Sequence, residues 1–170
     1  LLVFQPVTRA GLTCAITGGA LGGVFADVDV KADSSKYAEM TAAGLTLALL
    51  GVDYLTDGGV FDRIYSNGTQ TVIGLVLMLF LFLLGKTGEH RGRTHSFIYM
   101  GLTSLAFTLI YGEMAAAFAI EYLSHLAADL VNMKPEKLLF PSQKGYCLNL
   151  CHSDRLANEL CFTLSVSLSA

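Results

Sequence analysis

The sequence predicts an all-α integral membrane protein, a bundle of about five or six transmembrane helices with polar clusters on one face. Hydrophobic residues make up 53% of the 170 residues and charged residues only 15%, whereas soluble domains carry about 25% charge. The mean hydropathy is +0.54, and the apolar residues gather in runs such as VIGLVLMLFLFLLG at 72–85. Such runs, separated by polar turns, are typical of membrane helices. The net charge of −3 gives no basis for nucleic-acid binding.

The first two helices follow from the apolar runs near the start of the chain. The first is expected from Val7 to Phe25, where glycines at 18, 19, 22 and 23 give small-xxx-small spacings that let a neighbouring helix approach closely. The second is expected from Tyr37 to Tyr54. LTDGGVFDRIYSNG at 55–68 is rich in turn residues and is predicted as a connection.

Three further segments complete the predicted bundle. A third helix is expected over Thr69–Lys86 and a fourth over Ser96–Tyr111, and after a break at YGEM (111–114) a fifth continues to Val131. A last apolar segment starts near Glu159. We expect one transmembrane domain over residues 1–170, and a sequence that is incomplete at one or both ends.

Counting the spans places three polar clusters on one side of the membrane. Alternating helices deliver them there as the pairs Asp27 and Asp29, His90 and His95, and His125 and Asp129. Nine of the eleven Lys and Arg residues fall on the same side, with only Arg9 and Arg63 opposite. The positive-inside rule makes the cluster side cytoplasmic, although basic residues kept for anion binding would bias this count.

The clusters have the composition of a metal site. Neutral imidazole and carboxylate are common ligands for Zn, Mn and Fe. Glu121, His125 and Asp129 are spaced i, i+4, i+8 and share one helix face, and Gly92 permits a turn that brings His90 and His95 together. Each cluster alone also fits a simpler interpretation: a solvated acidic loop, a basic anchor at the interface, or hydrogen bonding at a helix end. Their coincidence on one side favours a divalent ion held by Asp27, Asp29, His90, His95, His125 and Asp129.

The same motifs resemble a known family. GVFADVDV, EHRGRTHSF and YLSHLAADLVN…LLFP occur in the order found in the YdjM-like membrane-bound proteins, described as metal-dependent hydrolases and, for some members, as LexA-regulated inner-membrane proteins. The resemblance covers roughly residues 11–159 and implies a helical bundle in the inner membrane. Two family histidines are missing: the first helix has none, and Val30 follows Asp29.

These observations predict a metal-dependent hydrolase at the cytoplasmic membrane boundary. A bound ion would activate water, Asp29 would be general base, and Arg91 would steady a substrate anion, with a phosphate ester or lipid headgroup as substrate. The alternative is a non-enzymatic structural subunit of a larger membrane assembly that keeps the fold of the family. An ion path through Glu121 and His125 is less favoured, because no second acidic row lines a route. Expected partners are the lipid bilayer and other membrane subunits.

Overall fold

The computed structural model describes residues 9–31, 33–56, 59–89 and 91–150. Within these ranges the regular elements are all helices, and the only β pairing is an isolated bridge between Glu136 and Tyr146. The prediction of an all-α membrane bundle is therefore confirmed. In chain order the helices are α1 (Arg9–Phe25), α2 (Asp33–Leu55), α3 (Val60–Ser66), α4 (Thr69–Lys86) and α5 (Phe97–Val131).

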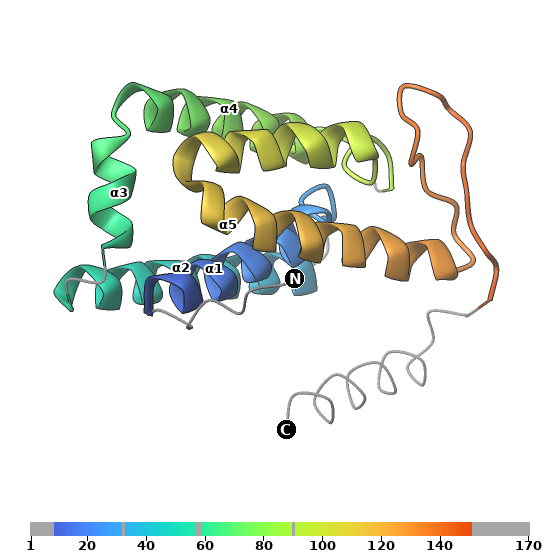
Figure 1. Cartoon of the computed structure of the whole chain (residues 1–170). Coiled ribbons are helices and arrows are strands. Elements are labelled where there is room, and N and C mark those ends of the chain that lie inside the picture. The colour runs from blue at the N-terminus through green and yellow to red at the C-terminus, as the bar shows by residue number, and fades with distance from the viewer. Residues whose placement is uncertain (1–8, 32, 57–58, 90, 151–170) are drawn as a thin grey trace, which may run out of the picture.

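Helix α5 contains a break at Tyr111. This residue has φ −160° and ψ 105°, an extended conformation inside the 35-residue helix. Figure 1 shows the result: the arm before the break (97–110) and the arm after it (112–131) run back in opposite directions. The predicted interruption at YGEM is thus confirmed, and α5 supplies the fourth and fifth predicted helices.

Three helical segments in the described chain are long and apolar enough to cross a membrane: Ser35–Leu55, Thr69–Lys86 and Phe97–Val131. Ala10–Phe25 is apolar but shorter. With a rise of ~1.5 Å per residue, the first arm of α5 is about 20 Å long, less than the ~30 Å hydrocarbon core. The segment predicted from Glu159 lies outside the described residues.

Helix α3 is a difference from the sequence analysis, which predicted only a connection between α2 and α4. Its first turn is stabilised by Asp53 at the end of α2, whose carboxylate accepts a hydrogen bond from the backbone N–H of Val60 at 2.9 Å. The Thr71 hydroxyl donates to the Ile64 carbonyl at 2.7 Å and covers its last turn. Both of these side chains lie outside α3, in the neighbouring helices α2 and α4. The seven residues of α3 are too few to give a periodic signal of their own.

Helix α1 packs against the second arm of α5 by backbone contact. A Cβ added at Gly18 would meet the Met114 carbonyl oxygen, and one at Gly22 would meet the Phe118 carbonyl oxygen. Gly23, by contrast, faces open space. The predicted small-xxx-small contact is confirmed and uses the Gly18–Gly22 face.

The order of the helices gives the bundle two different ends. The C-terminal ends of α1, α4 and the second arm of α5 lie together at the right of Figure 1. Helix α3 and the Tyr111 break lie at the left. We call the first the site end and the second the far end.

Candidate metal centre

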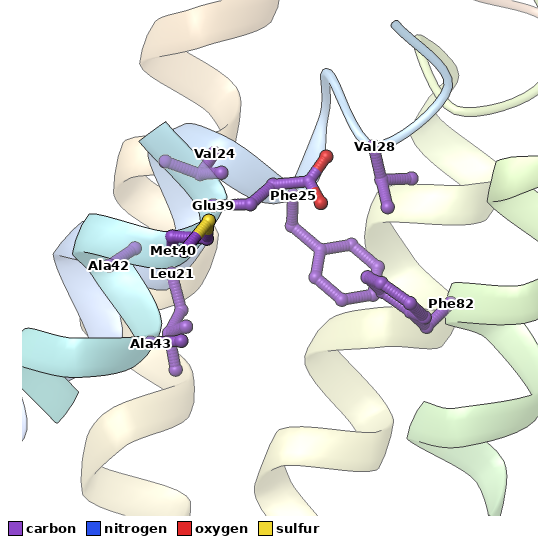
Figure 2. Close-up of a pocket in the computed structure, with 9 residues that line it drawn as sticks. All are labelled: Leu21, Val24, Phe25, Val28, Glu39, Met40, Ala42, Ala43 and Phe82. Carbon is purple, nitrogen blue, oxygen red and sulfur yellow. The ribbon is translucent and has the colours of Figure 1, made fainter. Parts of the chain in front are cut away.

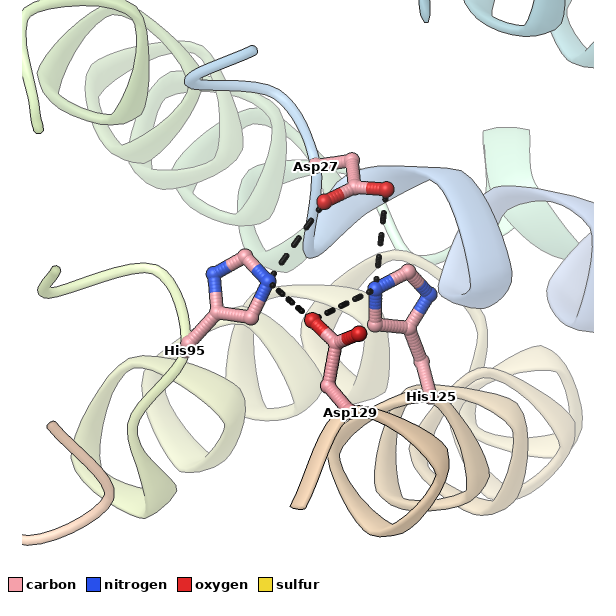
Figure 3. A group of neighbouring side chains, drawn as sticks. All are labelled: Asp27, His95, His125 and Asp129. Carbon is pink, nitrogen blue, oxygen red and sulfur yellow. Dashed lines mark ion pairs between the residues drawn. The ribbon is translucent and has the colours of Figure 1, made fainter. Parts of the chain in front are cut away.

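Four of the predicted ligands meet at the site end. Asp27 comes from the turn after α1, His95 from the residues before α5, and His125 and Asp129 from successive turns of the second arm of α5. Each offers one ligand atom, and these atoms all lie within 4.8 Å of one another. Figure 3 shows the two carboxylates between the two imidazoles. Segments distant in sequence thus build one cluster.

The separations suit a small divalent ion. His95 Nε2 lies 3.1 Å from Asp129 Oδ2 and 3.4 Å from Asp27 Oδ1. His125 Nε2 lies 3.6 Å from Asp27 Oδ2 and 3.8 Å from Asp129 Oδ2. A tetrahedral ion with bonds of about 2.0–2.1 Å holds its ligand atoms about 3.3–3.4 Å apart. Two imidazole nitrogens and two carboxylate oxygens are ligand types for Zn, Mn or Fe, and a shared ion would draw together the ligand atoms, which now lie within 4.8 Å of one another.

The His95 ring is oriented by contacts on the side away from the cluster. The Thr94 hydroxyl donates to Asp29 Oδ2 at 2.6 Å and lies 3.1 Å from His95 Nδ1. Because its proton goes to Asp29, this hydroxyl accepts from a protonated Nδ1. With Nδ1 protonated, Nε2 of a neutral ring would be free to bind an ion held between Asp27 and Asp129, and Nε2–H of a protonated ring would donate to these carboxylates. Such outer contacts are typical of histidines that bind metals.

Arg91 orients Asp129 in a similar way. Its guanidinium donates to Asp129 Oδ1 at 2.8 Å and to the Lys134 carbonyl oxygen at 2.6 Å. This leaves Asp129 Oδ2 for the two histidines. In this turn Arg91 itself has the left-handed backbone conformation, with φ 60°. Glycine is required at position 92 for a different reason, because a Cβ there would lie 2.6 Å from the Glu89 carbonyl oxygen.

Three hydrogen bonds hold the loop before α5 in place. Ser96 caps α5 by accepting a hydrogen bond from the Tyr99 N–H at 3.2 Å, as expected for an N-cap serine. The buried Tyr122 hydroxyl donates to the Thr94 carbonyl at 2.5 Å. The N–H of Phe97 donates to the Leu138 carbonyl at 3.1 Å, which joins this loop to the segment after α5. The loop that contains His95 is therefore fixed to both α5 and the segment after α5.

The four side chains of the cluster differ in their exposure. The side chain of Asp27 is 36% exposed, those of His125 and Asp129 are 21% and 20% exposed, and that of His95 is fully buried. Burial alone would lower the pKa of His95, but hydrogen bonds to Asp129 and Asp27 raise it to about 9. Burial alone would raise the pKa of Asp27, but its hydrogen bonds with His125 and His95 lower it well below its usual range. Without an ion, the charges compensate one another.

The remaining predicted site residues have other positions. Asp29 is buried behind His95 and is not one of the four residues that converge. Arg91 reaches the cluster through Asp129. Glu121 is exposed and lies outside the cluster. His90 lies outside the described residues.

Sequence reasoning missed one group beside the cluster, the carboxyl of Glu136. It is fully buried, and within the described part of the chain neither carboxyl oxygen has a hydrogen-bond partner. Burial and the negative charge of Asp129 raise its pKa to about 7, against the opposing charges of His95 and Arg91. The sequence around it, KPEK at 134–137, is typical of a solvated loop and gives no signal of burial.

A comparison with known protein families identifies the family of this chain. The family model described as "YdjM inner membrane protein" matches residues 2–167. The chain belongs to the YdjM inner membrane protein family. This match confirms the resemblance found from the sequence and makes the molecule an inner-membrane protein. No curated protein and no solved structure matches the chain.

Proposed function

We propose that this YdjM family member is a metal-dependent hydrolase whose site faces the cytoplasm at the membrane boundary. The observation that carries the proposal is the convergence of two imidazoles and two carboxylates, with all four ligand atoms within 4.8 Å. Eight of the basic residues in the described ranges lie at the site-end termini of helices or in the segments that follow them: Lys31, Lys36, Lys86, Arg91, Arg93, Lys134, Lys137 and Lys144. This charge supports a cytoplasmic orientation and an anionic substrate, a phosphate ester or lipid headgroup.

The residues divide into ligands and groups that position ligands. His95, His125, Asp27 and Asp129 would hold the ion, and a substrate would reach it past the side chain of Asp27, the most exposed of the four at 36%. A divalent ion there would polarise the ester and lower the pKa of water. Asp29, predicted as general base, has contacts that support a role in holding His95 through Thr94. Arg91, predicted to steady a substrate anion, has contacts that support a role in holding Asp129.

Activity with and without metal tests this proposal. Purified protein in detergent is freed of metal with a chelator, reloaded with Zn, Mn or Fe, and assayed on 4-nitrophenyl phosphate and dioleoyl phosphatidic acid. We expect phosphate release only after reloading, and a loss of at least ~100-fold in Asp129→Asn, since the ligand and its link to Arg91 are both altered. Glu113→Gln, at the exposed far end, is the control and should retain activity. Equal rates in Asp129→Asn and in the control would contradict the proposal.

A structural subunit is the second candidate. The distances between the histidines and aspartates, 3.1–3.8 Å, also suit ion pairs between protonated imidazole and carboxylate without any metal. In that case the cluster joins α1, the loop before α5 and α5 itself by charge alone. The protein would then bind no ion, would release no phosphate, and would lose only stability on substitution of His125.

A further inference from the structure

An apolar cavity lies beside the cluster, between α1, α2 and α4. Its volume is about 350 Å³, within the range of ~300–1,000 Å³ found for ligand pockets. Figure 2 shows the side chains that line it, among them Leu21, Phe25, Met40, Ala43 and Phe82. Every lining residue is apolar except Glu39. The cavity therefore suits an apolar ligand.

The polar end of this cavity is next to the cluster of Asp27, His95, His125 and Asp129. Val28, which lines the cavity, stands between Asp27 of the cluster and Asp29 behind it. The hydroxyl of Ser35 donates to the Asp27 carbonyl at 3.2 Å, so the start of α2 is joined to the same turn. Figure 2 shows Val28 and the Glu39 carboxylate at one end of the cavity, and Leu21 and Ala43 towards the other. The cavity thus leads from the site end into the apolar part of the bundle.

The ammonium group of Lys86 lies at this polar end. Lys86 Nζ pairs with both oxygens of Glu39, at 2.7 and 2.8 Å, while its side chain remains 35% exposed. Lys86 is the last residue of α4 and Glu39 is in the first turns of α2, so the pair lies near the expected level of lipid headgroups.

The exposure of α2 around the cavity favours a lipid chain as its ligand. In the apolar window of α2 only 11% of the residues are buried, so this helix presents most of its surface to lipid. A helix of a partner protein, ~10 Å wide, would have to lie across a groove whose lining side chains come from three helices. An extended hydrocarbon chain is much thinner and is the commonest molecule at this depth of a membrane.

We propose that the cavity holds one acyl chain of a glycerophospholipid whose phosphate lies at the candidate metal centre. This inference rests on the proposed function and narrows its substrate class to phospholipids drawn from the membrane between α2 and α4. The acyl chain fixes the position of the lipid, and the headgroup extends past Lys86 towards the open face at Asp27.

Photolabelling tests this proposal without relying on hydrolysis. Metal-free full-length protein is placed in nanodiscs that contain phosphatidic acid with a diazirine midway along one acyl chain. After irradiation, labelled peptides are mapped by mass spectrometry. We expect label concentrated on the α2 and α4 peptides that contain Met40 and Phe82, with competition by unlabelled phosphatidic acid.

A matched pair of variants supplies the control. Ala43 lines the cavity and is exposed, whereas Ala48 is exposed on the same helix but is not a lining residue. Ala43→Trp should fill the cavity and lower the labelling at least fivefold, and Ala48→Trp should leave it unchanged. Ala43→Phe serves as a smaller blocking residue if the Trp variant does not fold.

Three results would overturn the proposal: uniform labelling of all lipid-facing helices, labelling unaffected by both Ala43 variants, or a cavity that captures another protein's helix. Because the metal is absent, failure of the hydrolase proposal gives a different outcome, in which the cavity is labelled normally and loaded protein releases no phosphate. If loaded protein is active but labelling is uniform, only the acyl-chain site is wrong.

Discussion

The two ends of the bundle carry the same kind of ion pair in different surroundings. At the site end, Arg91 and Asp129 are 2.8 Å apart and their side chains are 10% and 20% exposed. At the far end, Arg63 and Glu113 are 3.0 Å apart and are 64% and 56% exposed. Exposed pairs contribute about 0–1 kcal/mol, whereas loss of one partner from a buried pair costs about 3–5 kcal/mol. Burial, rather than distance, separates a structural contact from a surface contact here.

The difference extends to the groups around each pair. Arg63 at the far end also donates to the Tyr111 hydroxyl at 3.3 Å and otherwise meets solvent. At the site end, Asp129 lies among two histidines and a second carboxylate within 4.8 Å. Gathering these groups out of water costs free energy. A bound cation would offset that cost, which is why the comparison favours a metal centre at one end only.

The largest expected effect comes from removing one arginine at each end. Arg91→Ala should lower the free energy of unfolding by about 3 kcal/mol or more, since Asp129 loses its buried partner. Arg63→Ala should change it by less than about 1 kcal/mol. Thermal or denaturant unfolding in detergent measures both. Similar values for the two variants would remove the distinction between the ends.

The pH dependence of the metal-free protein should reflect the site end. The pKa of His95 rises from 6.5 in the unfolded chain to about 9 in the fold. The protonated His95 ring contributes on the order of 3 kcal/mol to the free energy of unfolding. This contribution is fully present below about pH 6.5 and is lost as pH rises through about 9. Unfolding measured from pH 6 to pH 10 with a chelator present should show this loss.

Bound metal should alter that profile. Ligand histidines must be deprotonated, so loaded protein should gain metal affinity over the same rise in pH. His95→Gln should remove most of the change in the metal-free protein, and Glu113→Gln at the far end should keep it. A metal-free profile that stays flat between pH 6.5 and 9 would mean that His95 is neutral without an ion.

A smaller effect is expected where α1 meets α5 near the site end. Gly22→Ala should destabilise by about 2 kcal/mol, because its Cβ would press on the Phe118 carbonyl. Gly23→Ala is the matched control, because its Cβ meets open space and alanine favours a helix by up to ~1 kcal/mol over glycine. Melting curves of the two variants should therefore shift in opposite directions. Equal shifts would show that α1 does not make this close contact.

Labelling should separate the two ends without altering stability. Ser66 is exposed at the end of α3, and Ser142 is exposed in the segment after α5. Single cysteines at these positions, in a background lacking the native cysteines, should react with impermeant reagents from opposite sides of the membrane. Cysteine at 142 should react only from the cytoplasm. Labelling of both from one side would contradict the topology.

Local patterns predicted much of this molecule. Long apolar runs located α4 within its observed bounds, and YGEM marked the break at Tyr111. The i, i+4 spacing placed His125 and Asp129 together because a helix fixes that geometry. Counting spans then brought Asp27 and His95 to the same end. Each of these inferences depends on periodicity or on order along the chain.

Features that depend on tertiary contacts could not be predicted in this way. The first turn of helix α3 is stabilised by the carboxylate of Asp53, and the sequence of residues 60–66 does not indicate this hydrogen bond. Glu136 is fully buried, although Lys134 and Lys137 near it in the sequence are charged. Asp29 was grouped with Asp27 as a ligand, yet its contact with Thr94 places it behind His95. The backbone turn after α1 decides which of these two carboxylates, two residues apart, faces the cluster.

Metal content tests the central claim most directly. Protein purified without chelator, and protein reloaded with Zn, Mn or Fe and washed, would be measured by elemental mass spectrometry together with His125→Ala and Arg63→Ala. We expect about one ion per chain in the native protein and in Arg63→Ala, and none in His125→Ala, since one of four ligands is gone. An ion content near zero in native protein after reloading, with His125→Ala losing stability alone, would contradict a metal centre and leave a cluster of ion pairs.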